Sequence, residues 1–149
     1  MYSSIYAKYI ELIAPHQGVS VPELTRYSGL CALLKEELPK ISWVGFYFLG
    51  ADEHLWVGPY QGKVACQRIA PGRGVCGTAF QTHKVQIVPN VHDYPGHIAC
   101  DSLSLSEIVL PVFKQDKFIG VFDLDSHALA AFDETDAELL KKLVELLHR

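Results

Sequence analysis

The sequence predicts an α+β domain in which a central antiparallel sheet of about six strands is flanked by helices. Between residues 41 and 126, runs of apolar and aromatic residues are separated mostly by short turn signals, as in strands joined by short turns. Apolar residues at helical spacing precede and follow this region. The 149 residues contain no low-complexity segment, so we expect one domain over 1–149. Its parts are a helical N-terminal segment (1–40), a sheet and site region (41–126) and a closing helix (133–148).

The charge distribution limits the classes of partner. The chain has 13 basic and 17 acidic residues, and the basic residues are scattered singly. A nucleic-acid partner would require a basic stripe, so none is expected. The first residues lack a basic start and a long apolar run, so we expect no signal peptide, no membrane partner and a cytoplasmic location. In that reducing compartment, a disulfide among the four cysteines would be catalytic or regulatory.

The N-terminal segment predicts two helices. The first covers about residues 2–13 and ends at Ala14-Pro15. The second begins near Pro22, which suits the first turn of a helix, and runs to Leu38. Cys31 lies on the apolar stripe of this second helix, so we assign it to the core.

The first predicted strand covers residues 42–49, and a hairpin partner follows over 54–59. Trp43, Gly45 and Tyr47 share one face of the first strand, because side chains alternate along a strand. Apolar residues occupy the other face too, so two layers must cover the sheet. The Trp43/Tyr47 face is either core or the aromatic wall of a small-molecule pocket.

Two cysteines lie in the segment that follows. A third strand over residues 64–69 would place Cys66 within or beside it. Pro71-Gly72-Arg73-Gly74 then turns the chain into a helix, so Cys76 lies near the N-terminus of that helix. A helix dipole lowers the pKa of a nearby thiol, which makes Cys76 a candidate reactive group.

Three acidic residues are placed by the last strands. Glu107 heads a strand over 106–113, and a hairpin turn leads into a strand over 118–125. Alternation puts Asp123 and Asp125 on one face of this last strand. The pair either marks the end of the strand in solvent or belongs to a site. A capped closing helix begins after Asp133.

Cys100 lies in a segment dense in polar residues, 91–102, where Pro95-Gly96 predicts a surface loop. His92 and His97 could take the thiol proton or stabilise the thiolate, which is the nucleophilic form. The alternative is a small buried cysteine with no chemistry.

Four segments, 43–47, 72–79, 96–102 and 106–111, together resemble the free methionine-R-sulfoxide reductases, which are enzymes built on a GAF domain. With 119–126 and the region near Phe132 included, the resemblance covers about residues 40 to 145 in the same order and spacing. It implies a GAF fold and an oxidoreductase that repairs an oxidised amino acid under oxidative stress.

The resemblance also implies roles for three cysteines. Cys100 matches the thiolate that attacks the sulfur of free methionine-R-sulfoxide and becomes a sulfenic acid. Cys66 matches the resolving cysteine, which forms a disulfide with it, and Cys76 an alternate resolving cysteine. Thioredoxin would reduce the redox-active disulfide.

Five residues match the substrate pocket of that family: Trp43, Tyr47, Glu107, Asp123 and Asp125. Carboxylates would bind the ammonium group that only a free amino acid carries. Glu107 is our hypothesis for the proton donor, because neighbouring charges would keep it protonated. No cofactor and no metal ion are implied.

Two other functions remain as alternatives. A GAF domain can be a non-enzymatic sensor of small molecules, although a second domain to regulate is not visible here. The cysteines with His92 or His97 could form a metal site, although zinc sites usually show close Cys-x-x-Cys pairs. The apolar stripe of residues 2–13 is compatible with a homodimer.

Overall fold

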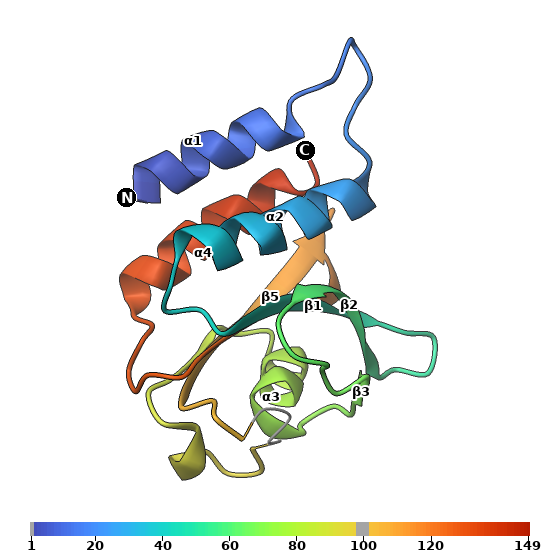
Figure 1. Ribbon diagram of the computed structural model, residues 1–149. Coiled ribbons are helices and arrows are strands. Elements are labelled where there is room, and N and C mark those ends of the chain that lie inside the picture. The colour runs from blue at the N-terminus through green and yellow to red at the C-terminus, as the bar shows by residue number, and fades with distance from the viewer. Residues whose placement is uncertain (1, 98–101) are drawn as a thin grey trace.

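The fold is a six-stranded antiparallel sheet with helices on both faces, seen in a computed structural model that describes residues 2–97 and 102–149 (Figure 1). The strand order is β3-β2-β1-β6-β5-β4, and every neighbouring pair is antiparallel. The α+β prediction is therefore confirmed. Along the chain the elements are α1 (Tyr2–Ile13), α2 (Glu23–Glu37), β1 (Trp43–Leu49), β2 (Leu55–Gln61), β3 (Arg68–Ile69), α3 (Gly74–Thr82), β4 (Gln86–Val88), the 3-10 helix η1 (Val91–Asp93), β5 (Ser106–Lys114), β6 (Lys117–Ser126) and α4 (Glu134–Leu146).

The third strand is shorter than the sequence predicts. β3 contains two residues, and residues 62–67 form a loop, so Cys66 lies on a loop and not in a strand. Val64 is 82% exposed, so this apolar side chain has no buried face against which the strand could extend. Pro22 is also displaced by one position from the prediction, because it is the N-cap of α2.

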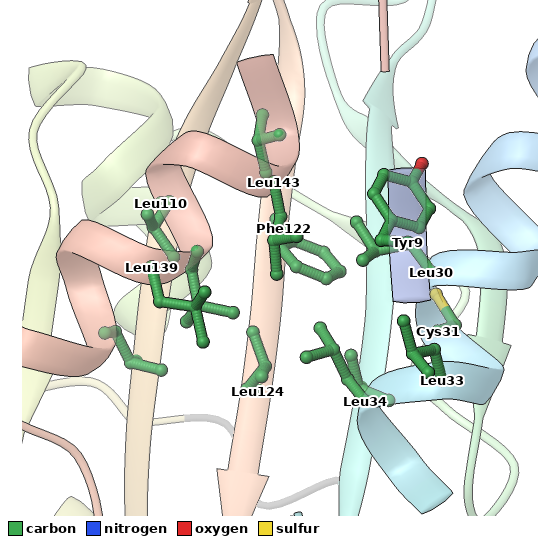
Figure 2. Packing of buried hydrophobic residues seen from close by; sticks show 14 of the residues in the cluster. Tyr9, Leu30, Cys31, Leu33, Leu34, Leu110, Phe122, Leu124, Leu139 and Leu143 are labelled. Carbon is green, nitrogen blue, oxygen red and sulfur yellow. The ribbon is translucent and has the colours of Figure 1, made fainter. Parts of the chain in front are cut away.

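The larger core lies between the sheet and the layer of α1, α2 and α4 (Figure 2). Val44 and Phe46 of β1 and Phe122 of β6 point into this layer, and the rings of Phe46 and Phe122 stack with centroids 4.3 Å apart. Cys31 is 1% exposed within it, which confirms its assignment to the core. Each such buried apolar side chain contributes about 1.5–3 kcal/mol relative to an exposed one.

The smaller core lies on the opposite face of the sheet, under α3. Val75 and Ala79 of α3 pack on Val109 and Val121, which alternate along β5 and β6 with the residues of the larger core. Trp43 and Tyr47 belong to this smaller cluster. Both faces of the sheet are thus covered, as the apolar pattern of the first strand predicts. Within the described residues, no helix has the length and apolar composition that crossing a bilayer requires.

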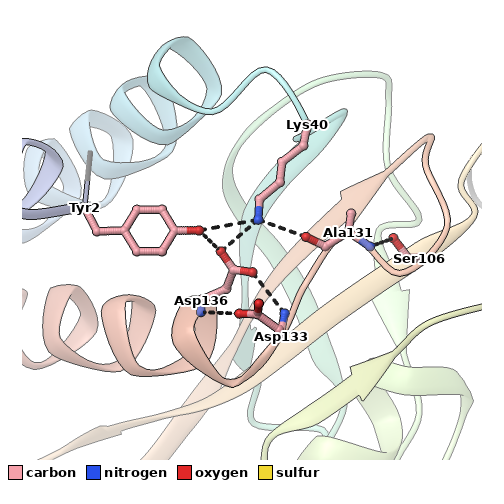
Figure 3. A network of polar contacts seen from close by, with 6 residues as sticks. All are labelled: Tyr2, Lys40, Ser106, Ala131, Asp133 and Asp136. Atoms are coloured by element: carbon pink, nitrogen blue, oxygen red, sulfur yellow. Dashed lines mark hydrogen bonds and ion pairs between the residues drawn. The ribbon is translucent and has the colours of Figure 1, made fainter.

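A polar network joins α1 to the start of α4 (Figure 3). The hydroxyl of Tyr2 donates to Asp136, and Lys40 Nζ lies 2.8 Å from the same carboxylate and 2.8 Å from the carbonyl oxygen of Ala131. Asp136 also forms a capping box with Asp133, each side chain accepting from the backbone N–H of the other residue. Burial alone would raise the pKa of Asp136, but the hydrogen bonds from Lys40 and Tyr2 outweigh it and hold that pKa below its usual value.

We expect Asp136→Asn to lower the free energy of unfolding at pH 7 by about 1–3 kcal/mol, because hydrogen bonds to a charged group are lost. Since the folded pKa of Asp136 is depressed, this contribution is present above the unfolded pKa of about 3.9 and is lost as pH falls below it. Urea unfolding of both proteins at pH 7 and pH 3 measures the difference, which should shrink at the lower pH.

Asp133→Asn is the matched control for this substitution. It removes the same charge from the same capping box, but asparagine caps helices as well as aspartate. The prediction fails if the two variants lose equal stability at pH 7.

Candidate active site

Strand register brings three acidic side chains together on the face that carries α3. Asp125 of β6 pairs with Trp43 of β1 on one side and with Glu107 of β5 on the other. Asp123, two residues earlier in β6, pairs with Gly45 of β1. Directly opposite residues have Cβ atoms about 4.5–5.5 Å apart, so this register alone clusters the carboxyl groups. Their nearest oxygens lie within 4.8 Å of one another.

These acids line a cavity of about 50 Å³ between the sheet, the N-terminus of α3 and the loop 62–67. Every pocket residue that the sequence predicts borders this cavity: Trp43, Tyr47, Glu107, Asp123 and Asp125. Cys76 borders it as well. Cys100, the predicted nucleophile, lies outside the described residues. The five predicted pocket residues thus lie around one cavity together with Cys76, and their roles in binding and catalysis stay predictions.

The acids resist ionisation. Burial raises the pKa of Glu107 well above its usual range, and the charges of Asp123 and Asp125 raise it further. Burial and the charge of Asp125 raise the pKa of Asp123 in the same way. Like charges this close cannot all ionise at neutral pH unless a cation joins them. The cluster therefore holds carboxylic acid protons or attracts a cation.

Two buried oxygens in the cavity lack a partner among the described residues. Asp123 Oδ1 and Ser104 Oγ have no hydrogen bond there, although the two residues are only 6% and 5% exposed. A buried polar atom without a partner costs about 1–3 kcal/mol, so a ligand with N–H or O–H donors would be favoured. An ammonium group fits three carboxyl oxygens. The same three acids, Glu107, Asp123 and Asp125, are also the described residues that could hold a metal ion.

Aromatic rings form one wall of the cavity. The rings of Trp43 and Tyr47 stack with centroids 5.9 Å apart. Burial raises the pKa of Tyr47, and the charges of Asp123, Asp125 and Glu107 add to the effect, so its phenol stays neutral. The wall is therefore apolar and uncharged beside an acidic floor.

The structure corrects the argument from the helix dipole at Cys76. Cys76 is a free thiol in the first turn of α3, as predicted, but it is 6% exposed. Burial raises the pKa of this thiol well above its usual value, and the charges of Asp123 and Glu107 raise it further. These two causes outweigh the dipole. Cys66, in contrast, is half-buried and disulfide-bonded.

Sequence reasoning did not assign three polar residues of the cavity: Lys63, Arg73 and Ser104. The turn Gly72-Arg73-Gly74 was a usable signal, because a cation directly before α3 must lie beside the first-turn residue Cys76. Of the two histidines considered, His97 borders the cavity and His92 is exposed. Burial lowers the pKa of His97, and the neighbouring His92 lowers it further, so His97 is neutral near pH 7.

Comparison with known proteins gives consistent matches. The GAF domain family model matches residues 27–148. Free methionine-R-sulfoxide reductase of Escherichia coli is 48% identical over 126 residues, which cover 85% of this chain and 76% of that protein. GAF domain-containing protein A of Dictyostelium discoideum is 47% identical over 143 residues, or 94% of this chain and 90% of that protein.

A solved structure is similar over nearly the whole chain. The X-ray structure of free methionine-R-sulfoxide reductase from Neisseria meningitidis in complex with its substrate superposes with a TM-score of 0.90 at 40% identity. The match covers 99% of this chain and 86% of that one.

We expect Asp123→Asn to stabilise the protein at pH 7.5, because it removes a buried carboxyl group whose ionisation is opposed by burial and by the charge of Asp125. The folded pKa values of Glu107 and Asp123 are raised, so their contribution to stability is present below the unfolded pKa of about 4 and is lost as pH rises. The gain should therefore be smaller at pH 4.5. Urea unfolding at both pH values measures it.

Asp116→Asn provides the control, because Asp116 is exposed in the β5–β6 turn and the substitution changes net charge equally. Equal effects of the two substitutions would show that net charge, and not the buried cluster, sets the stability.

Proposed function

Because the chain belongs to the GAF domain family and, within it, to the free methionine-R-sulfoxide reductases, we propose that it reduces free L-methionine-R-sulfoxide to L-methionine. The observation that carries this proposal is the unpartnered oxygen of Asp123, buried between two further carboxyl groups and beside an aromatic wall. One end of the cavity suits a cation, and the other suits an apolar chain.

The acidic floor supports selectivity for the free amino acid. The ammonium group of free methionine sulfoxide supplies three N–H donors, and Glu107, Asp123 and Asp125 offer carboxyl oxygens within 4.8 Å of one another. Within a peptide chain, the same nitrogen is an uncharged amide with at most one donor. A methionine sulfoxide residue in a protein would then leave the buried acids without a counter-charge.

The aromatic wall supports binding of the side chain. Trp43 and Tyr47 present stacked ring surfaces to the cavity. A methyl sulfoxide on a short aliphatic chain can pack against such rings, and sulfur contacts with aromatic rings are favourable by about 0.3–1.5 kcal/mol. The acidic floor and the aromatic wall would thus contact opposite ends of one small substrate.

The proposed chemistry needs two cysteines. The Cys100 thiolate attacks the sulfoxide sulfur, the oxygen passes to Cys100 as a sulfenic acid, and methionine leaves. The Cys66 thiol then attacks the sulfenic sulfur, so that an S–S bond forms, the S–O bond breaks and water leaves. A dithiol such as thioredoxin reduces the disulfide by exchange. The disulfide bond of Cys66 is consistent with its role as the resolving cysteine.

Cys76 remains the alternate resolving cysteine of this proposal. Its thiol borders the cavity, but its raised pKa keeps it protonated, and the thiolate is the reactive form. We therefore expect Cys76 to resolve the sulfenic acid more slowly than Cys66.

Glu107 is the proposed proton donor. Burial and two neighbouring carboxylates keep this side chain in its acid form near neutral pH. Protonation of the sulfoxide oxygen as the thiolate attacks would avoid a separate oxyanion. Because the folded pKa of Glu107 is raised, the donor is lost as pH rises through that pKa.

The test of substrate and nucleophile uses three substrates with dithiothreitol as reductant. We expect methionine release from free methionine-R-sulfoxide, and at least about 100-fold less from the S epimer and from a peptide carrying the sulfoxide, because the peptide lacks the ammonium group. Amino-acid analysis measures the product. Cys100→Ser should release none.

Cys31→Ser is the matched control, since Cys31 is buried in the other core and borders no part of the cavity. If reduced, folded wild-type protein releases no methionine from any substrate, the reductase proposal is wrong, and a sensor that only binds its ligand becomes the better account.

We expect Glu107→Gln to lower kcat by about 100-fold or more, the usual range for loss of a general acid, and to remove the fall in kcat at alkaline pH. Affinity should change much less, because glutamine keeps an oxygen acceptor for the ammonium group. Calorimetric binding in a Cys100→Ser background measures affinity without turnover. Glu138→Gln on the exposed face of α4 is the control, and an unchanged kcat in Glu107→Gln would exclude this acid.

A further inference from the structure

The indole of Trp43 is bonded to the loop that carries Cys66. Its Nε1–H donates to the carbonyl oxygen of Lys63 over 3.0 Å. Lys63 precedes Cys66 by three residues on the loop 62–67, which connects β2 to β3. One side chain is therefore both a wall of the cavity and a hydrogen-bond partner of this loop.

The indole itself is held firmly. It stacks with Tyr47 of β1 and with Tyr60 of β2, with ring centroids 5.9 Å and 5.3 Å away and interplanar angles of 28° and 22°. Trp43 is 5% exposed and belongs to a strand that is paired on both sides. The N–H group is therefore fixed in direction by packing that does not depend on the loop.

Gly62 allows the loop to approach the indole this closely. A Cβ atom on Gly62 would lie 2.6 Å from Trp43 Cδ1 and 3.0 Å from the carbonyl oxygen of Ser42. The φ angle of Gly62 is +133°, a backbone conformation that other residues rarely adopt. A side chain here would displace either the ring or the start of the loop.

We propose that Trp43 is a positioning residue for Cys66 and that Gly62 makes this contact possible. The inference rests on the proposed reaction and adds a requirement to its second step. The hydrogen bond to Lys63 sets where the loop leaves the sheet, and so where the Cys66 thiol lies when it attacks the sulfenic sulfur of Cys100 and water leaves. Trp43 therefore acts in recycling as well as in substrate binding.

The loop is held to the sheet near both of its ends, by the Trp43 bond to Lys63 and by the backbone bond from Val57 N–H to the carbonyl oxygen of Gln67, while only Ala65 and Cys66 of its middle are partly buried. Val64, which follows Lys63, is 82% exposed, and Lys63 is exposed too. Formation of a disulfide requires the two Cα atoms to approach within about 7 Å, so a displacement of a few ångströms stops it. Methionine release needs no contribution from the Cys66 thiol and does not share this requirement.

The test measures the two steps separately in a single turnover without reductant. Methionine release reports the first step, and the loss of titratable thiols together with trapping by a sulfenic-acid reagent such as dimedone reports the second. In Trp43→Phe, which keeps an aromatic ring but lacks the N–H, the ratio of disulfide formation to methionine release should fall at least 10-fold. Gly62→Ala, outside the cavity lining, should lower the same ratio.

Two further variants calibrate the result. Gly18 also has a positive φ, of +82°, but has open space around it, so the ratio in Gly18→Ala should match wild type. Cys66→Ser defines the signal expected when resolution by Cys66 is absent.

A ratio unchanged in Gly62→Ala and Trp43→Phe, or a proportionate slowing of both steps, overturns the positioning role. If Trp43→Phe releases no methionine, the ratio in Gly62→Ala alone decides the matter. Failure of wild-type protein to release methionine would contradict the proposed reaction itself, which is a different outcome.

Discussion

The burial of three carboxyl groups on one face of the sheet is the constraint on which the rest of the structure depends. β6 lies between β1 and β5, and its register with both strands places Asp125 opposite Trp43 and Glu107. A slip of one residue would turn every side chain of β6 to the other face. Asp123 and Asp125 would then enter the apolar layer beneath α2 and α4. The register must therefore be specified by something other than the acids, which repel one another.

Apolar side chains on the opposite face of the sheet specify the register of β6. Val44 and Ile108 both pair with Leu124, which lies between the two aspartates in sequence, and all three point into the larger core. The stacked rings of Phe46 and Phe122 are the next row of the same layer. Burial of these side chains offsets the electrostatic cost of the acids, and the strand pleat links the two effects residue by residue. A cluster that destabilises the protein is thus kept in place by the core on the other side of the sheet.

Period-two alternation explains why so much of the fold and site could be predicted. Trp43, Tyr47 and Asp123 follow from alternation within single strands, and the sheet then brings them to one cavity. Alternation does not predict how deeply a side chain is buried. The helix dipole was therefore expected to lower the pKa of Cys76, whereas burial raises it. Loop residues such as Lys63 have no periodicity at all. The shortness of β3 was missed for a related reason, because Val64 has the composition of a strand but no face to bury it.

The cavity is lined by paired strands and by a loop, which differ in how firmly the fold holds them. Glu107, Asp123 and Trp43 lie on strands paired on both sides, which suits fixed charges and a fixed wall. Cys66 lies on a loop, and in the proposed reaction its sulfur must change partners in every cycle. Tryptophan suits the contact between the cavity wall and this loop, because its apolar body stacks with Tyr47 and with Tyr60 while its N–H remains available to a backbone carbonyl. Phenylalanine could form the wall but could not hold the loop, so the choice of aromatic residue has a physical basis.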